Sequence, residues 1–170
     1  MSQLFTKVDT LRPLSRVAGD VKVLHVSDIH NNPVALDFII QIADSFGVDM
    51  VIDTGDITDY GTPLEAKLLE KINQLDIPYI FVAGNHDSPE IIDKMKSFSN
   101  VVVLKADVVS IEGLVVAGLA DPAAESNQIK PLEEDDTKEY QQGLKQLVTR
   151  LQTPPHIVAV HHDELVTPLL

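Results

Sequence analysis

One arrangement occurs three times in the first hundred residues: a short apolar run, a polar loop, and a helix that begins with proline. The apolar runs cover residues 21–27, 50–53 and 77–82, and they are rich in the β-branched residues that favour strands. Each following helix has an N-cap residue and proline at its first position: Asn32-Pro33, Thr62-Pro63 and Ser88-Pro89. Strands and helices that alternate at this spacing form right-handed βαβ units, so the sequence predicts a parallel sheet.

Apolar residues repeat at helical spacing after each of these caps. Gly47 ends the first helix, whose apolar face is Ala35, Phe38, Ile39, Ile42, Ala43 and Phe46. Thr62 and Glu65 form a capping box in the second, whose predicted buried face is Leu64, Leu68, Ile72 and Leu75. The buried face of the third is Ile91, Ile92, Met95 and Phe98. We therefore expect three amphipathic helices packed against the sheet.

The rhythm changes after residue 100. Residues 101–104, 108–111 and 114–117 are short β-branched runs, and they predict strands joined by hairpins, with Glu112-Gly113 as one turn. Residues 133–152 have a helical pattern, and residues 156–160 form a further strand that ends at His161. We interpret residues 1–20 as a lead-in arm and residues 21–170 as one domain.

Composition excludes several classes of protein. The chain has 170 residues, no cysteine and a net charge of −13, so thiolate chemistry is absent and a basic nucleic-acid-binding surface is not offered. No apolar run is long enough to span a bilayer, and the N-terminus lacks the apolar core of a secretory signal. We expect a cytoplasmic protein, or a cytosol-facing domain of a larger parent.

Polar residues follow the carboxyl ends of the predicted strands, where open α/β sheets bind their ligands. They are Asp28, His30, Asp56, Asp59, Asn85, His86 and His161. Each alone has an ordinary structural reading, such as a turn aspartate or a left-handed turn asparagine. Together they form a mixed oxygen and nitrogen set that suits manganese, iron or zinc better than calcium. His25 and His156 lie within or at the start of strands, and we interpret both as structural.

Three motifs and one histidine resemble those of the calcineurin-like metallophosphoesterase family. They are D-I-H at residues 28–30, G-D-I-T-D at 55–59, G-N-H-D at 84–87, and His161. The resemblance covers residues 21–163 and implies a four-layer α/β/β/α sandwich that holds two divalent cations, manganese first, with iron or zinc as alternatives. It further implies that Asp28 and His30 bind one cation, that Asn85 and His161 bind the other, and that Asp56 bridges both.

The same resemblance implies an activity. It is hydrolysis of a phosphomonoester or phosphodiester by attack of a metal-bridging water, with a small phosphoester as substrate. His86 takes the place of the family's acid on the leaving group, and Asp59 would accept a hydrogen bond from its other ring nitrogen. Asp87 is interpreted as a loop stabiliser. The alternative is a non-catalytic or weakly metal-binding interaction module; a nuclease is a third reading, which would need a basic groove.

The sequence departs from the family pattern in one respect. The final motif, glycine-histidine-any-histidine, is absent, so each cation would keep three protein ligands and bind weakly. We therefore expect the parent protein to be the enzyme and this chain to be weakly active or inactive. We expect a domain truncated before its last strands, with an open sheet edge that another chain or a homodimer could cover. His161 and His162 are adjacent and would point to opposite faces of a strand, and His161 is preferred because it comes first.

Overall fold

A parallel four-stranded sheet carries the first half of the chain in the computed structural model, which describes residues 19–126 and 134–170. Its strands lie in the order β1 (Val23–Val26), β2 (Met50–Asp53), β3 (Tyr79–Phe81) and β4 (Val101–Val103). All three pairings are parallel, as the alternation of strands and helices predicted. Most of the predicted lead-in arm lies outside the described residues, and its boundary stays a prediction.

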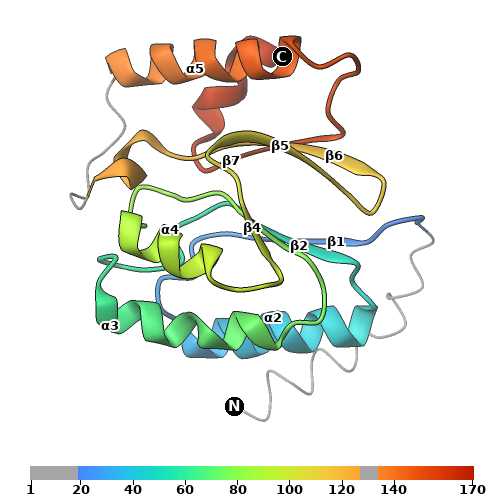
Figure 1. The fold of residues 1–170 in the computed structure, drawn as a ribbon, viewed down its shortest axis with the longest axis vertical. Coiled ribbons are helices and arrows are strands. Elements are labelled where there is room, and N and C mark those ends of the chain that lie inside the picture. Colours follow the sequence, from blue (N-terminus) through green and yellow to red (C-terminus); the bar gives the residue numbers. More distant parts are fainter. Residues whose placement is uncertain (1–18, 127–133) are drawn as a thin grey trace.

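Helices α2 (Pro33–Phe46), α3 (Pro63–Ala66) and α4 (Pro89–Lys96) cover one face of this sheet, and 3₁₀ helix η2 (Lys67–Gln74) continues α3 (Figure 1). Their starts confirm the predicted caps. The Asn32 side chain accepts from the first turn of α2, and Ser88 does the same for α4. Thr62 and Glu65 form the predicted capping box. Gly47 ends α2 in the left-handed conformation, with φ 59°.

A second, three-stranded sheet lies against the other face of the first. It consists of β5 (Ala106–Ile111), β6 (Leu114–Leu119) and β7 (Ile157–Val160), with β5 antiparallel and β7 parallel to β6. Helices η3 (Pro122–Glu125), α5 (Glu134–Thr149) and η4 (Asp163–Leu169) complete this half, and α5 and η4 form the outer layer (Figure 1). The result is the expected four-layer α/β/β/α sandwich.

The predicted series of hairpins is only partly correct. Glu112 and Gly113 have φ values of 51° and 78° and join β5 to β6 as a tight hairpin. Residues 101–103 instead pair in parallel with β3, so they belong to the first sheet. Helix α4 supplies the crossover that a parallel pairing requires, which makes this run the end of another βαβ unit.

Apolar residues fill the three spaces between the four layers. The space between the helices and the first sheet contains Leu36, Ile39, Tyr79, Phe81, Ile91 and Met95 among others. The space between the sheets contains Met50, Ile52, Ile80, Val82, Leu104, Val116 and Ala159. Leu119, Leu144 and Leu165 are buried between the second sheet and its outer layer. Within the described ranges, no helix is both long and apolar enough to cross a membrane.

The predicted buried face of the second helix is wrong at two positions. Leu64 is 73% exposed and Leu68 is 45% exposed, whereas Leu69 is 1% exposed. The buried residues repeat at every third position: Ala66, Leu69, Ile72 and Leu75. A 3₁₀ helix has three residues per turn, so side chains at i and i+3 share a face. The error came from applying α-helical spacing to a segment that is mostly 3₁₀.

Leu64 and Leu69 provide a matched test of this packing. Leu69→Ala should lower the free energy of unfolding by about 2–5 kcal/mol because it opens a cavity in the core. Leu64→Ala removes the same atoms from an exposed side chain and should change stability by less than about 0.5 kcal/mol. Urea denaturation of both variants measures the difference. Equal losses would contradict the 3₁₀ register.

Candidate metal centre

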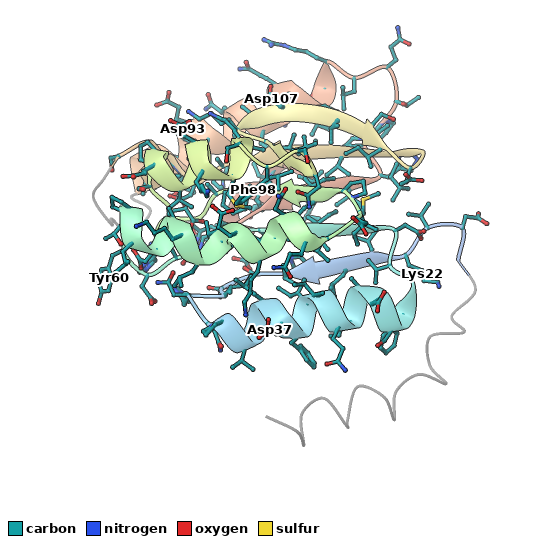
Figure 2. All side chains as sticks on the ribbon, turned by 60° about the horizontal axis from the view of Figure 1, so that its bottom comes forward. Lys22, Asp37, Tyr60, Asp93, Phe98 and Asp107 are labelled. Atoms are coloured by element: carbon teal, nitrogen blue, oxygen red, sulfur yellow. The ribbon has the colours of Figure 1, made fainter. Side chains whose placement is uncertain are left out.

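The loops after β1, β2, β3 and β7 meet at one end of the molecule. Lys22, just before β1, lies at the opposite end from Tyr60, which belongs to the loop after β2 (Figure 2). β1, β2 and β3 are parallel, so their carboxyl ends share the end that Tyr60 marks. The residue after β7 reaches the same end, because Nδ1–H of His161 donates to the carbonyl of Thr54 just after β2. This is the edge where the sequence predicted a ligand site.

The loops after β1 and β2 remain hydrogen-bonded to each other beyond the strands. The N–H of Asp28 donates to the carbonyl of Gly55 at 2.9 Å, and the N–H of His30 donates to that of Asp56 at 3.0 Å. Asp28, His30 and Asp56 all have left-handed backbones, with φ values of 55°, 46° and 56°. Non-glycine residues adopt this conformation at a cost, and such strain is concentrated at functional sites. The strain turns these side chains toward a common space.

The loops after β2 and β3 touch through two glycines. A Cβ on Gly55, whose φ is 102°, would lie 2.2 Å from the main-chain nitrogen of Gly84. A Cβ on Gly84 would lie 2.3 Å from Oδ1 of Asp56 and 2.9 Å from Nδ1 of His161. Only glycine fits at either position, because the contact atoms belong to backbone or to candidate ligands.

The buried carboxylate of Asp87 ties the same two loops together. It accepts from the main-chain N–H groups of Asp56 (2.8 Å), Ile57 (3.1 Å), Thr58 (3.2 Å) and Gly84 (2.9 Å). The Thr58 hydroxyl donates to it at 3.1 Å. Burial raises the pKa of Asp87 to about 6, against the lowering effect of these donors. These contacts match its expected part as a loop stabiliser.

Asp56 lies between two imidazoles. Its Oδ2 is 3.4 Å from Nε2 of His161 and 3.8 Å from Nε2 of His30. Nε2 of His30 is also 3.9 Å from Oδ1 of Asp28. Candidate ligand atoms of Asp28, Asp56 and His161 all lie within 4.8 Å of one another. Four residues from three strand ends thus converge on one point.

Hydrogen bonds orient His161 toward this point. Its Nδ1–H donates to the carbonyl of Thr54 at 2.9 Å, which leaves Nε2 facing Asp56. Burial disfavours the charged forms of His161 and Asp56, but the attraction between the two charged groups outweighs it. This attraction raises the pKa of His161 to about 9. Together with the hydrogen bond from the N–H of His86, it lowers the pKa of Asp56. His162 points elsewhere, with its Nε2 3.2 Å from Oδ2 of Asp121. This geometry favours His161 over His162 as a ligand.

Asp59 contacts two histidines by two different groups. Nδ1–H of His86 donates to the main-chain carbonyl of Asp59 at 2.7 Å. The Asp59 carboxylate instead lies 3.1 Å from Nδ1 of His30. Asp59 thus accepts from His86 as expected, through its main-chain carbonyl, while its carboxylate lies beside His30. The rings of His30 and His86 pack edge to face, with their centroids 5.1 Å apart.

Asn85 lies in the loop after β3, half-buried beside these groups. The N–H of its neighbour His86 donates to Oδ1 of Asp56 at 2.9 Å, which holds this loop against the cluster. Gly84, on the other side of Asn85 in the chain, lies against Asp56 and His161. His25 and His156 lie outside the cluster, bonded to Thr54 and to the N–H of Val115 respectively.

Sequence reasoning missed two buried acids near the cluster. Asp53 accepts from the Tyr79 hydroxyl at 2.6 Å and from the N–H of Gly55 at 2.9 Å, and burial raises its pKa to about 8. Asp121 is 1% exposed at the end of β6. The strand-end signal could have found Asp121, but the predicted strand stopped at residue 117.

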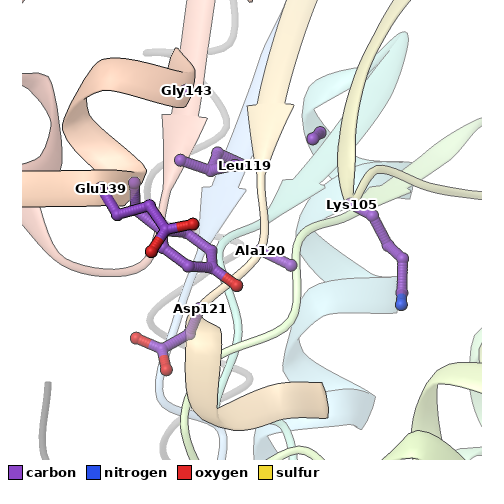
Figure 3. A pocket seen from close by; sticks show the side chains of 8 residues that line it. Lys105, Leu119, Ala120, Asp121, Glu139 and Gly143 are labelled. Carbon is purple, nitrogen blue, oxygen red and sulfur yellow. The ribbon is translucent and has the colours of Figure 1, made fainter. Parts of the chain in front are cut away.

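A hollow of about 250 Å³ lies on the far side of Asp121, between β6 and α5. Its lining includes Lys105, Leu119, Tyr140 and Glu139, and Lys105 points away from Asp121 (Figure 3). None of the candidate ligands lines it. The candidate site is therefore the histidine and aspartate cluster and not this hollow.

The donors present fit divalent cations. Two carboxylates and two imidazoles form the mixed oxygen and nitrogen set of manganese, iron or zinc sites. Nδ1 of His161 donates to the Thr54 carbonyl, and Nδ1 of His30 lies 3.1 Å from the Asp59 carboxylate. In each ring Nε2 is therefore the nitrogen on the side of Asp56, and it can bind a cation once it is deprotonated. A bridging role for Asp56 is consistent with its position between them.

Comparison with known proteins identifies the family. A model of the calcineurin-like phosphoesterase family matches residues 21–166, which is most of the chain. The chain belongs to this family, and the resemblance found in its motifs is confirmed. A solved crystal structure shares the fold, with a TM-score of 0.58 at 15% sequence identity, over 80% of this chain and 66% of that chain.

Two curated relatives match shorter segments. The chain is 54% identical over 43 residues to a probable glycerophosphodiester phosphodiesterase GpdQ from Arcobacter nitrofigilis, a match that covers 25% of this chain and 16% of the relative. It is 33% identical over 88 residues to a DNA double-strand break repair protein Mre11 from Sulfurisphaera tokodaii, covering 41% and 23%. Each match thus spans less than a quarter of the relative's length.

Gly84→Ala tests whether the two glycines hold the cluster together. The added Cβ must displace Asp56 or His161, so we expect manganese affinity to fall at least about tenfold, as for lost supporting contacts at metal sites. Gly143→Ala is the control, because nothing lies within 4 Å of its added Cβ in α5. That variant should keep its affinity and gain roughly 0.5–1 kcal/mol of stability. Calorimetric titration measures both, and unchanged affinity in Gly84→Ala would contradict the packing described.

Proposed function

We propose that the chain carries the centre of a dinuclear, divalent-metal-dependent phosphoesterase. One observation carries the proposal: Asp56 lies between His30 and His161, with Asp28 completing the cluster. Carboxylate oxygens have enough lone pairs to serve two cations at once. The family supports the activity class, and the geometry supports the assignment of ligands.

The proposed ligands divide into two sets. Asp28 and His30 would hold one cation, Asn85 and His161 would hold the other, and Asp56 would serve both. Manganese is the first candidate, with iron and zinc as alternatives. Two such cations would supply an activated water and neutralise charge on the phosphoryl oxygens. The chain's part is to fix the donors, which the loop contacts of Gly84 and Asp87 accomplish.

His86 is the proposed acid for the leaving group. Because its Nδ1–H donates to the Asp59 carbonyl, Nε2 is the nitrogen that holds or releases the catalytic proton. Its main chain is fixed by the bond from its N–H to Asp56. An imidazole is suited to this step because the same ring nitrogen can both donate and accept a proton.

The proposed substrate is a small phosphoester. One relative is named as a probable glycerophosphodiester phosphodiesterase, and a glycerophosphodiester is a small phosphodiester. The other is named as a DNA repair protein, but a net charge of −13 gives little attraction for a polyanion. A diester is favoured over a monoester on the first relative's name.

Hydrolysis assays with manganese test the proposal. Because each proposed cation site has only three protein ligands, wild-type protein should cleave bis(p-nitrophenyl) phosphate slowly and at high manganese concentration. Asp56→Asn should lose both this activity and the bound metal. His86→Ala should keep its metal and lose about 10²–10⁴-fold in rate on an alkyl phosphodiester. Its loss should be smaller on the p-nitrophenyl ester, because that leaving group needs little protonation. His156→Ala is the matched control, since His156 contacts only the β6 main chain among the interactions described.

Two results would overturn the assignment. Full activity in Asp56→Asn or in His86→Ala with the alkyl ester would remove the proposed mechanism. Metal binding with no hydrolysis of either ester by wild-type protein would favour the alternative, an interaction module on the same scaffold. Preference for single-stranded or duplex DNA over the small esters would favour the nuclease reading.

A further inference from the structure

Glu65 is a buried acid at the start of α3, 8% exposed and outside the metal cluster. Its Oε2 accepts from the N–H and the hydroxyl of Thr62, at 2.6 and 2.7 Å. Its Oε1 accepts from the N–H groups of Asp59 and Tyr60, at 3.2 and 3.0 Å. Burial opposes the charge, but these donors outweigh it and lower the pKa of Glu65 to about 2. One carboxylate thus fixes the whole turn from residue 59 to residue 62.

Asn31 extends this network to the loop after β1. Its Nδ2 donates to Oδ2 of Asp59 at 3.0 Å and to Oε1 of Glu65. Its own backbone is left-handed, with φ 55°, and its N–H donates to the carbonyl of Ile57 at 3.0 Å. Because Asn31 directly follows His30, it connects Glu65 and Asp59 to the loop that carries His30.

The residue held most firmly by this network is Asp59. Its N–H bonds to Glu65, its carboxylate bonds to Asn31, and its two remaining acceptors face the imidazoles. The carbonyl accepts from Nδ1 of His86, and Oδ1 lies 3.1 Å from Nδ1 of His30. Both rings consequently carry their proton on Nδ1 and present Nε2 to the site.

A helix cap does not explain the full set of contacts. The capping box needs only the Oε2 contacts with Thr62. The contacts of Oε1 with Asp59, Tyr60 and Asn31 add nothing to the cap. They instead give the second carboxylate oxygen three hydrogen-bond donors from outside the helix. Glu65 therefore stabilises the loop after β2 as well as the start of α3.

We propose that Glu65 and Asn31 are positioning residues that act through Asp59 to set the ring orientation of both His30 and His86. This inference rests on the proposed function for its consequence, since one ring is a proposed ligand and the other the proposed acid. Among the interactions described, the side-chain hydrogen bonds of Asn31 and Glu65 go to residues 59–62 and to each other. The two residues determine which ring nitrogen faces the cluster.

Three variants separate positioning from capping. Glu65→Ala removes both halves of the network. Asn31→Gly removes the bridge to Asp59, leaves the capping box intact and suits the left-handed backbone. Thr62→Ala weakens the cap but retains the Oε1 contacts of Glu65 with Asp59 and Tyr60. Circular dichroism establishes that each variant is folded.

Two measurements read the result. Long-range ¹H–¹⁵N spectra of the metal-free protein at alkaline pH should show single Nδ1–H tautomers for His30 and His86 in wild-type protein and in Thr62→Ala. Both tautomers should appear for these rings in Glu65→Ala and Asn31→Gly. Calorimetric titration with manganese should show affinity reduced about 10–100-fold in the last two variants, as for lost partners of metal ligands.

The outcomes distinguish this inference from the proposed function. Equal losses in Thr62→Ala and Glu65→Ala, or wild-type tautomers in Asn31→Gly, would reduce Glu65 to a helix cap. If the tautomers behave as expected but wild-type protein hydrolyses no phosphoester, the proposed function fails and the positioning stands. If wild-type protein is active and Glu65→Ala keeps its tautomers and affinity, the positioning fails alone.

Discussion

The hydrogen bonds to the Asp87 carboxylate are the constraint on which the site depends. They bring four main-chain N–H groups from the loops after β2 and β3 onto one buried acid. Unpaired, those groups would each carry the cost of a buried polar group without a partner. With them paired, Gly84 can lie against Asp56, and Asp56 reaches both imidazoles. The sheet brings the loops to one edge, and the Asp87 carboxylate fixes the position of the loop after β2 relative to the loop after β3.

A second layer of acids holds the histidines. Asp59 contacts His30 with its carboxylate and His86 with its carbonyl, while Glu65 fixes Asp59 from the helix side. The left-handed backbones at Asp28, His30 and Asp56 are held in place by the same loop contacts. Local strain of this kind persists only where the surroundings determine it. The site is therefore built by loops that are hydrogen-bonded to one another, and Ile29, Ile57 and Ala83 anchor these loops in the apolar core.

Much of this could be predicted from local pattern. Proline after an N-cap residue marked all three helix starts, and the strand-end rule grouped Asp28, Asp56 and His161 correctly in space. The failures have physical causes. Leu64 was misplaced because 3₁₀ and α spacing differ by less than one residue per turn, and residues 101–103 because a single strand does not reveal its partner. The carbonyl contact of Asp59 and the part of Glu65 depend on loop backbone conformation, which side-chain patterns do not encode.

The central claim is that Asp56 joins two cation sites formed by four strand-end loops. An anomalous difference map from crystals soaked in manganese measures this directly. The account predicts two peaks roughly 3.5–4 Å apart, with the Asp56 carboxylate between them. Asp28 and His30 should lie against one peak, and Asn85 and His161 against the other. A single peak that does not contact Asp56, or peaks only at other acidic residues, would contradict it.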